Sequence, residues 1–236
     1  MAQGKLYGIG VGPGDPELVT IKALRLLREV PAIFAPCKAA GEPSLASRIV
    51  CQLDGTLGAK ITNLVFPMSD DEAELDDAWQ AAARAVAGKL DDGIDCAFIA
   101  EGDPFLFGSF IYLFEKLAAD SGRRIEVIPG VSSITAAPAR AGIPLVRGDE
   151  RLAIVPAPSD RESIRRVLTD FESVVFMKIN PVFDTLVGVL EEMALLDRAT
   201  VVVKATTTEE RVIRRLADLK GRKPGYFSIM LVRRER

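Results

Sequence analysis

Apolar residues in the first half of the chain follow two alternating spacings. Short, nearly continuous apolar runs predict strands at residues 6–11, 32–35, 60–66, 94–100 and 124–128. Apolar residues three or four positions apart predict helices at residues 18–30, 44–53, 72–90 and 106–117, and Ser44 is placed to cap the second of them. A regular alternation of strand and helix is typical of a parallel sheet with helices on both faces.

The pattern changes at Pro129-Gly130, where a helix of small residues is predicted over residues 132–141. Strands are then predicted at residues 152–155, 173–177, 200–204 and 226–232, and helices at residues 161–168 and 182–195. No helix follows the last predicted strand, so we expect the second sheet to be mixed. The sequence therefore predicts an α/β protein with two domains, 1–129 with a mainly parallel sheet and 130–236 with a mixed sheet.

Composition narrows the class of protein. A net charge of −3 gives no reason to expect a nucleic-acid or membrane surface as partner. No apolar run is long enough to span a bilayer, and residues 1–5 lack the apolar core of a signal peptide. The three cysteines, Cys37, Cys51 and Cys96, lie far apart and form no CxxC pair, so we expect buried or loop thiols in a cytoplasmic protein.

The chain contains no histidine, which limits its chemistry. A Ser-His-Asp or Cys-His nucleophile is excluded, as is a metal site with histidine ligands, and we expect no bound metal. Proton transfer must then use carboxylates, lysine, tyrosine, cysteine or backbone groups. This favours a reaction in which the reagent arrives already activated.

A glycine-rich motif covers the end of the first predicted strand and leads into the helix that follows it. Its residues are Gly8-Ile9-Gly10-Val11-Gly12-Pro13-Gly14-Asp15-Pro16. The dinucleotide fingerprint G-x-G-x-x-G fails in both frames, because Pro13 or Asp15 occupies the third glycine position. An aspartate at a helix start would also repel phosphate, so the glycines suggest approach of an uncharged or cationic group. The alternative is a tight turn with Asp15 as the helix cap and Pro16 at the first helical position.

Two further motifs follow predicted strands. Glu101-Gly102-Asp103-Pro104 comes directly after the most apolar run, at the strand end where ligands bind in open α/β sheets. Carboxylates there suit ribose hydroxyls or a sulfonium. In Pro129-Gly130-Val131-Ser132-Ser133, the glycine allows an unusual backbone conformation and the serine hydroxyls can cap a helix or hold a ligand carboxylate. Each motif can also be read as a capped turn without a ligand.

In this order, the three motifs resemble those of the tetrapyrrole methylases, the class III S-adenosylmethionine methyltransferases, over essentially the whole chain. Within the family, the Phe66-Pro67-Met68 segment, Trp79 and the Tyr226-Phe227-Ser228 end are similar to the branch that methylates C-20 of precorrin-2 or cobalt-factor II. The resemblance implies cobalamin biosynthesis, S-adenosylmethionine as co-substrate in a cleft between two α/β domains, a small-molecule tetrapyrrole substrate and a homodimer. The cofactor contacts it implies are Pro13, Glu101, Gly102, Asp103, Leu106, Ser132, Ser133, Met177 and Ala205.

The resemblance also implies a mechanism. The sulfonium already carries a good leaving group, so the protein would chiefly align the reacting atoms. A base must remove one proton from the methylated carbon, and Asp103 or Asp15 is placed to do so, although cofactor binding or helix capping is the alternative role of each. Phe107 stands where this branch often has tyrosine, which removes a hydroxyl. Substrate carboxylates would be received by arginines, for which Arg48, Arg140, Arg147 and Arg151 are candidates.

Several alternatives stay open at this point. A protein of this fold could methylate another ring carbon, ribosomal RNA or a translation factor, although the acidic composition weakens the RNA case. A nicotinamide oxidoreductase would need the fingerprint that fails here. A regulator that binds S-adenosylmethionine without catalysis is a further possibility. The sequence does not distinguish metal-free from cobalt-containing substrate.

Overall fold

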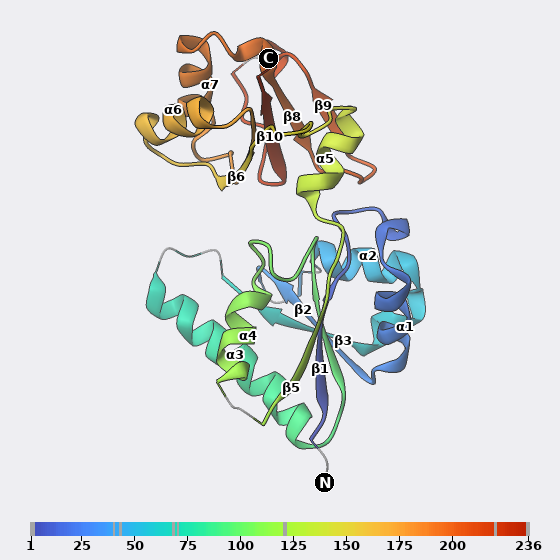
Figure 1. Cartoon of the computed structure of the whole chain (residues 1–236). Coiled ribbons are helices and arrows are strands. Elements are labelled where there is room, and N and C mark those ends of the chain that lie inside the picture. Colours follow the sequence, from blue (N-terminus) through green and yellow to red (C-terminus); the bar gives the residue numbers. More distant parts are fainter. Residues whose placement is uncertain are drawn as a thin grey trace. The chain divides into compact units, whose positions relative to one another are not determined.

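The computed structural model describes residues 3–39, 41–42, 44–67, 69, 71–119, 122–219 and 221–234. The chain divides into two compact units, Met1–Ser132 and Ser133–Arg236, and each is built around its own sheet (Figure 1). No helix in the described residues is both long enough and apolar enough to cross a membrane.

Unit 1 contains a sheet of five parallel strands in the order β3-β2-β4-β1-β5. Its elements are β1 (Lys5–Gly10), η1 (Pro16–Leu18), α1 (Ile21–Glu29), β2 (Ala32–Cys37), α2 (Leu45–Leu53), η2 (Gly55–Lys60), β3 (Ile61–Val65), α3 (Glu72–Asp91), β4 (Cys96–Ala100), α4 (Phe110–Ala118) and β5 (Arg124–Ile128). Strand β1 pairs with β4 on one side and β5 on the other, so that Ile9 lies level with both Ile99 and Ile128.

Side chains alternate between the two faces of this sheet, as expected for strands with a period of two. Ile9, Ile33 and Ile99 pack in a core with α1 and α2. Leu6 and Phe98 point to the opposite face, where they pack in a second core with α3 and α4. The two helix pairs cover opposite faces in Figure 1, which confirms the prediction of a parallel sheet with helices on both sides.

Side-chain caps decide where the helices of unit 1 begin. The Ser44 hydroxyl accepts a hydrogen bond from the Ser47 N–H at 3.0 Å, which confirms the predicted start of α2. The predicted helix over residues 18–30 begins later, because Thr20 caps α1 by accepting from the Ala23 N–H at 3.2 Å. The predicted helix over residues 106–117 also begins later, at Phe110, because the residues before it form a turn.

Unit 2 contains a mixed sheet in the order β6-β7-β10-β8-β9, as predicted. Its elements are α5 (Ser133–Ala141), β6 (Leu152–Pro156), α6 (Arg161–Asp170), β7 (Ser173–Met177), α7 (Phe183–Glu192), η3 (Leu196–Arg198), β8 (Ala199–Val203), β9 (Arg211–Ile213), η4 (Leu216–Leu219) and β10 (Ser228–Arg233). β10 is antiparallel to both β7 and β8, while β6 is parallel to β7. The three-residue strand β9 was not predicted, because it is too short to produce a pattern.

The sheet of unit 2 also has a core on each face. Val201 and Met230 face α6, α7 and η4, and Val202 and Leu231 face α5. Because β6, β7 and β8 run in the same direction, their carboxyl ends share one edge of the sheet. β10 runs in the opposite direction and therefore starts at that edge.

Candidate functional site

The three predicted motifs of unit 1 meet at one edge of its sheet. β4, β1 and β5 are neighbours, and one motif follows each of them. The Gly102 N–H donates to the Gly12 carbonyl at 2.8 Å, and the Val11 N–H donates to the Ala100 carbonyl at 3.0 Å. In open α/β sheets, ligands bind beyond the carboxyl ends of the strands, which makes this edge the candidate site.

Three glycines allow the loops at this edge to touch. A Cβ atom on Gly10 would lie 2.5 Å from the Gly102 carbonyl oxygen, and one on Gly130 would lie 2.1 Å from the same oxygen. Neither distance leaves room for a side chain. Gly102 itself adopts a left-handed backbone with φ +68°, and a Cβ there would find no atom closer than 3.8 Å. The loops are therefore closely packed, while the face of Gly102 is open to an approaching group.

Asp103 holds two of these loops together. One oxygen of its carboxylate accepts a hydrogen bond from the Phe105 N–H at 2.9 Å, within its own loop. The other accepts from the Gly130 N–H at 3.1 Å, in the loop after β5. The same loop contains Phe107, which has a left-handed backbone with φ 58°, and the exposed side chain of Leu106. Such strain in a non-glycine residue is typical of functional loops.

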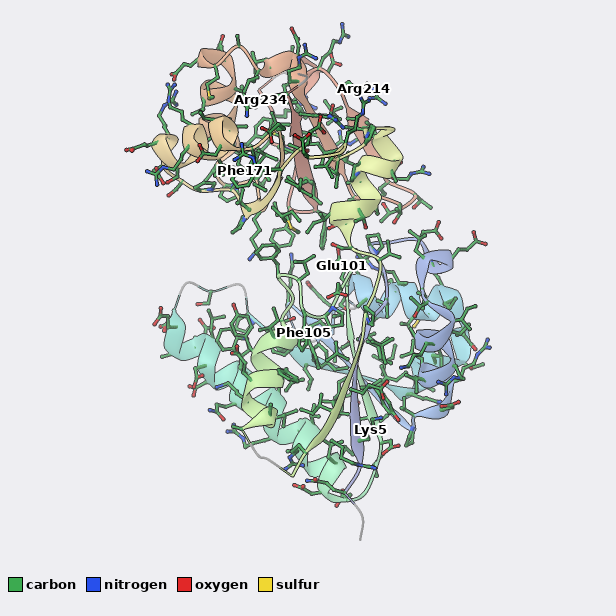
Figure 2. All side chains as sticks on the ribbon, viewed as in Figure 1. Lys5, Glu101, Phe105, Phe171, Arg214 and Arg234 are labelled. Carbon is green, nitrogen blue, oxygen red and sulfur yellow. The ribbon has the colours of Figure 1, made fainter. Side chains whose placement is uncertain are left out.

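Glu101 is a second half-buried carboxylate at this edge. Figure 2 places it at the end of the sheet opposite to Lys5, which begins β1. Burial raises the pKa of the Glu101 carboxyl to about 7, although the positive charges of Arg48 and Lys38 act in the opposite direction. A carboxyl with this pKa can both hold and release a proton near neutral pH.

Asp15 caps a helix, as its alternative interpretation predicted. Its carboxylate accepts a hydrogen bond from the Glu17 N–H at 2.9 Å, and Pro16 occupies the first position of η1. Pro13, in the same loop, is buried. The capped element is a single 3-10 turn, because Val19 returns to an extended backbone before α1.

The remaining candidate residues belong to unit 2, apart from Ser132, which ends unit 1. Ser133 begins α5, Met177 ends β7, and Ala205 follows β8. Met177 and Ala205 pack in the core that α5 covers, so these two positions lie on one face at the carboxyl edge of the second sheet, and Ser133 begins the helix that covers this face. The geometry does not test their contact with a ligand, which stays a prediction.

Backbone strain marks the same edge of unit 2. Lys178 follows β7 with φ 53°, and Lys204 and Thr206 follow β8 with φ 46° and 68°. The Lys204 N–H donates to the Phe227 carbonyl at 2.7 Å, which ties the loop after β8 to the segment before β10. Sequence reasoning missed these strained residues, because lysine and threonine carry no signal for a left-handed backbone.

Two of the four arginines expected to receive carboxylates are already engaged. Arg140 pairs with Glu210 at 2.9 Å, and Arg151 pairs with Glu172 at 3.3 Å. Arg48 is exposed on α2 and acts electrostatically on Glu101. Arg147 is also exposed, and its backbone N–H donates to the carboxylate of Glu150. Arg140 and Arg151 are therefore the weaker candidates.

In the part of the chain that the structure describes, the thiols and acidic groups do not gather into a metal site. Within the described ranges, no three cysteine, aspartate or glutamate side chains are grouped so that they could hold an ion. Cys37 and Cys96 are buried in strands, whereas Cys51 is exposed on α2, so the expectation of a buried or loop thiol was wrong for Cys51. All three thiols are free.

Comparison with known proteins agrees with the motifs. The model of the tetrapyrrole (corrin/porphyrin) methylases matches residues 5–220. The cobalt-precorrin-2 C(20)-methyltransferase of Salmonella typhimurium is 33% identical over 98% of this chain and 97% of that protein. The precorrin-2 C(20)-methyltransferase of a Sinorhizobium species is 34% identical over 97% of this chain and 95% of that protein.

A solved structure has the same fold. The uroporphyrin-III C-methyl transferase of Thermus thermophilus, complexed with S-adenyl homocysteine, superimposes with a TM-score of 0.63 at 24% identity, over 97% of each chain. The family model spans most of this chain, and both curated relatives exceed 30% identity over nearly its whole length. The protein therefore belongs to the tetrapyrrole (corrin/porphyrin) methylases.

Proposed function

We propose that this protein transfers a methyl group from S-adenosylmethionine to C-20 of precorrin-2, or of its cobalt form, in cobalamin biosynthesis. The observation that carries this proposal is the nearly full-length similarity to two C(20)-methyltransferases. One of these relatives is named for the cobalt-containing substrate and the other for the metal-free one, at almost the same identity. Both substrates therefore belong in the first assay.

The groups at the edge of the first sheet fit this methyl donor. S-adenosylmethionine carries a positive charge on its sulfur and hydroxyls on its ribose, and both favour carboxylates as neighbours. Glu101 and Asp103 supply carboxylates there, and the open face of Gly102 allows close approach to the backbone. A pyrophosphate would instead meet these negative charges and the cap at Asp15. These carboxylates therefore suit a cationic ligand better than a dinucleotide.

When bound, S-adenosylmethionine supplies a methyl group on a sulfur that is already a good leaving group. The task of the chain is then to bind and orient the two reactants. Close packing of Gly10, Gly102 and Gly130 holds the loops in one arrangement, and Asp103 connects two of them. The family resemblance implies cofactor contacts at Pro13, Glu101, Gly102, Asp103, Leu106 and Ser132 in unit 1 and at Ser133, Met177 and Ala205 in unit 2, and we propose these residues as the contacts.

The reaction also needs an acceptor for the proton lost from C-20. Both carboxylate oxygens of Asp103 already accept backbone N–H groups, and Asp15 caps η1. Glu101 has a pKa of about 7 and therefore suits proton transfer near neutral pH better than an ordinary carboxylate. The carboxylate of Glu101 is thus our first candidate for the acceptor, and that of Asp103 the second.

The test is turnover with S-adenosylmethionine that carries a ¹³C-labelled methyl group. With precorrin-2 or its cobalt form, we expect a product heavier by one methyl group in the mass spectrum, with the label at C-20 in the NMR spectrum. Label at another ring carbon would favour a sister methylase. Failure to methylate either substrate would overturn the assignment.

Calorimetry tests cofactor selectivity separately from turnover. We expect S-adenosylhomocysteine to bind and NAD(P) not to bind, for the electrostatic reason given above. Binding of NAD(P) without binding of S-adenosylhomocysteine would favour an oxidoreductase instead. Binding of S-adenosylhomocysteine without any methyl transfer would favour a regulator.

The family resemblance also implies a homodimer, and the composition suggests the cytoplasm. Sedimentation equilibrium across a range of protein concentrations tests the dimer directly. A mass of one chain at all concentrations would contradict it.

A further inference from the structure

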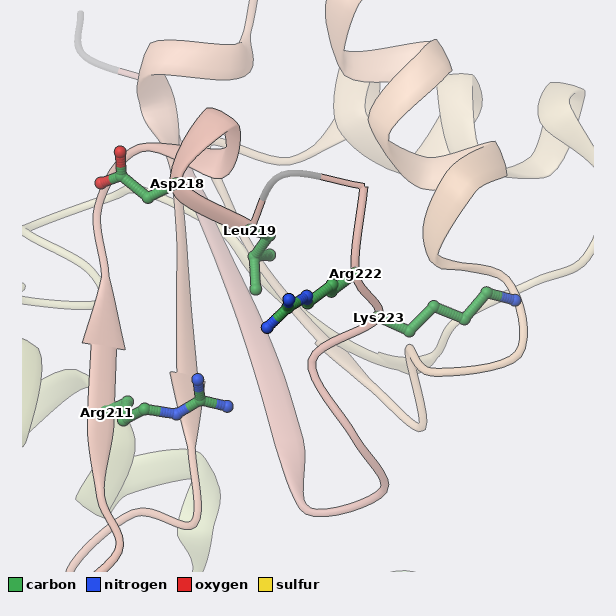
Figure 3. A pocket seen from close by; sticks show the side chains of 5 residues that line it. All are labelled: Arg211, Asp218, Leu219, Arg222 and Lys223. Carbon is green, nitrogen blue, oxygen red and sulfur yellow. The ribbon is translucent and has the colours of Figure 1, made fainter.

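Unit 2 has a hollow with basic side chains at its rim (Figure 3). Its volume is about 400 Å³, within the range of ligand pockets. The residues that line it are Arg211, Asp218, Leu219, Arg222 and Lys223. None of them belongs to the three motifs or to the contacts expected for the cofactor.

Two arginines of the hollow have no anionic partner among the residues that the structure describes. The guanidinium groups of Arg211 and Arg222 make no ion pair within the described part of the chain. Asp218 pairs with Arg215 at 3.2 Å, and Lys223 lies 3.8 Å from Asp184. In Figure 3 the side chains of Arg211 and Arg222 extend toward the space below Leu219, while Asp218 points away from it. The hollow is therefore positively charged.

The fold fixes where these arginines lie. Arg211 begins β9 and is level with Val203, the last residue of β8. It therefore lies at the carboxyl edge of the sheet, where Ala205 follows β8 and Met177 ends β7. Leu219 is buried against the core of unit 2, and its carbonyl accepts from the Arg222 N–H at 2.9 Å. The backbone on both sides of the hollow is thus anchored to the core.

We propose that this hollow binds acid side chains of the tetrapyrrole substrate through Arg211 and Arg222. The inference rests on the proposed function, which supplies a substrate with several acetate and propionate groups. Guanidinium groups match carboxylates in geometry and can bind them with two parallel hydrogen bonds. The volume of the hollow exceeds that of one carboxylate, so we expect room for more than one acid group of the substrate.

A carboxylate could also come from the amino-acid end of the methyl donor, and the experiment separates the two sources. We would make Arg211→Gln and Arg222→Gln and measure kcat, the KM for precorrin-2 and the Kd for S-adenosylhomocysteine. Arg215→Gln is the matched control, because Arg215 is a neighbouring arginine that does not line the hollow. Arg211→Lys and Arg222→Lys keep the positive charge but lose the planar guanidinium that can donate two parallel hydrogen bonds.

We expect each glutamine variant to raise the KM for precorrin-2 by about five- to tenfold, the loss of one charge-assisted contact at an open site. kcat and the Kd for S-adenosylhomocysteine should stay within about twofold of wild type, as should all three constants of Arg215→Gln. The lysine variants should fall between wild type and glutamine. The rise in KM should shrink at high salt, because salt screens exposed charges.

The negative results are distinguishable. If wild type methylates precorrin-2 while Arg211→Gln and Arg222→Gln keep the KM of Arg215→Gln, the inference is wrong and the proposed function stands. If the glutamine variants raise the Kd for S-adenosylhomocysteine instead of the KM for precorrin-2, the carboxylate belongs to the methyl donor and the inference is also wrong. If wild type methylates neither form of precorrin-2, both proposals fail together.

Discussion

The carboxylate of Asp103 accepts a hydrogen bond from the backbone N–H of Gly130 at 3.1 Å. The two residues follow different strands, β4 and β5, which lie on opposite sides of β1. Asp103 therefore connects two loops that the sheet brings to one edge. Because its other oxygen accepts from the Phe105 N–H, both ends of the carboxylate hold backbone in place. A residue of this kind can affect ligand binding through the loops as well as by contact.

Asp103→Asn tests this connection. Asparagine has one acceptor oxygen, so one of the two backbone N–H groups loses its partner, and we expect a loss of about 1–3 kcal/mol in the free energy of unfolding. If Asp103 also contacts the cofactor, affinity for S-adenosylhomocysteine should fall by about ten- to a hundredfold. Urea unfolding and calorimetry measure the two effects. Asp71→Asn is the control, because Asp71 caps α3 and asparagine is an equally good cap. Wild-type affinity in Asp103→Asn would contradict a role in binding.

Gly130→Ala tests the packing of the glycine loops. The new Cβ would lie 2.1 Å from the Gly102 carbonyl oxygen and 2.8 Å from Gly10, so the loops must separate. We expect a loss of about 3 kcal/mol in the free energy of unfolding, near the upper end for overpacking, together with weaker binding of S-adenosylhomocysteine. Gly88→Ala is the matched control, because a Cβ there meets no atom within 4 Å in the exposed part of α3. Its free energy of unfolding should rise by about 0.5–1 kcal/mol, because alanine favours a helix more than glycine does. Equal stability of Gly130→Ala and wild type would refute the close contact.

Glu101→Gln tests the raised pKa through the pH dependence of stability. The pKa of about 7 in the folded protein exceeds the ordinary value of 4.5, so the folded state holds a proton that the unfolded state releases. The stabilising contribution of the neutral carboxyl is complete below pH 4.5 and is lost as the pH rises through 7. Thermal melting from pH 4.5 to 8 should show wild type losing stability relative to Glu101→Gln over this range.

A second glutamate provides the control for that measurement. Its hydrogen bonds with Arg151 lower the pKa of Glu172 to about 2, so its contribution is lost only as the pH falls below the ordinary value. The difference between Glu172→Gln and wild type should therefore stay nearly constant from pH 5.5 to 8. A constant difference for Glu101→Gln over the same range would show that the Glu101 pKa is not raised.

Trp79 and Tyr112 connect α3 to α4 by stacking. Their ring centroids lie 4.0 Å apart with an interplanar angle of 5°. A double-mutant cycle with Trp79→Ala and Tyr112→Ala should give a coupling energy of about 0.5–1.5 kcal/mol, the usual value for an aromatic pair. Tyr112→Phe keeps the ring and should retain this coupling. Trp79 is the only tryptophan of the chain, so its fluorescence also reports the change in its neighbour. Additive single-variant effects would exclude a stabilising stack.

Local chemistry explains why several elements could be predicted correctly. The bounds of β5 and β7 agree with those predicted from apolar runs, and the caps at Ser44 and Asp15 depend on atoms only two or three residues away. The start of α4 was predicted wrongly from the same kind of pattern. The apolar residues 105–107 look helical, but Asp103 and the left-handed Phe107 hold them in a turn.

The alternation of strands and helices, the change to a mixed sheet and the motifs that identify the family could be predicted from the amino-acid sequence, because each depends on neighbouring residues. The three-dimensional fold was needed to show that Gly10, Gly102 and Gly130 touch and that Asp103 reaches Gly130. It also shows that Arg140 and Arg151 are paired, while Arg211 and Arg222 line a hollow without anionic partners among the residues described. These relationships join residues far apart in the chain, and strand order and register, rather than local spacing, set their distances.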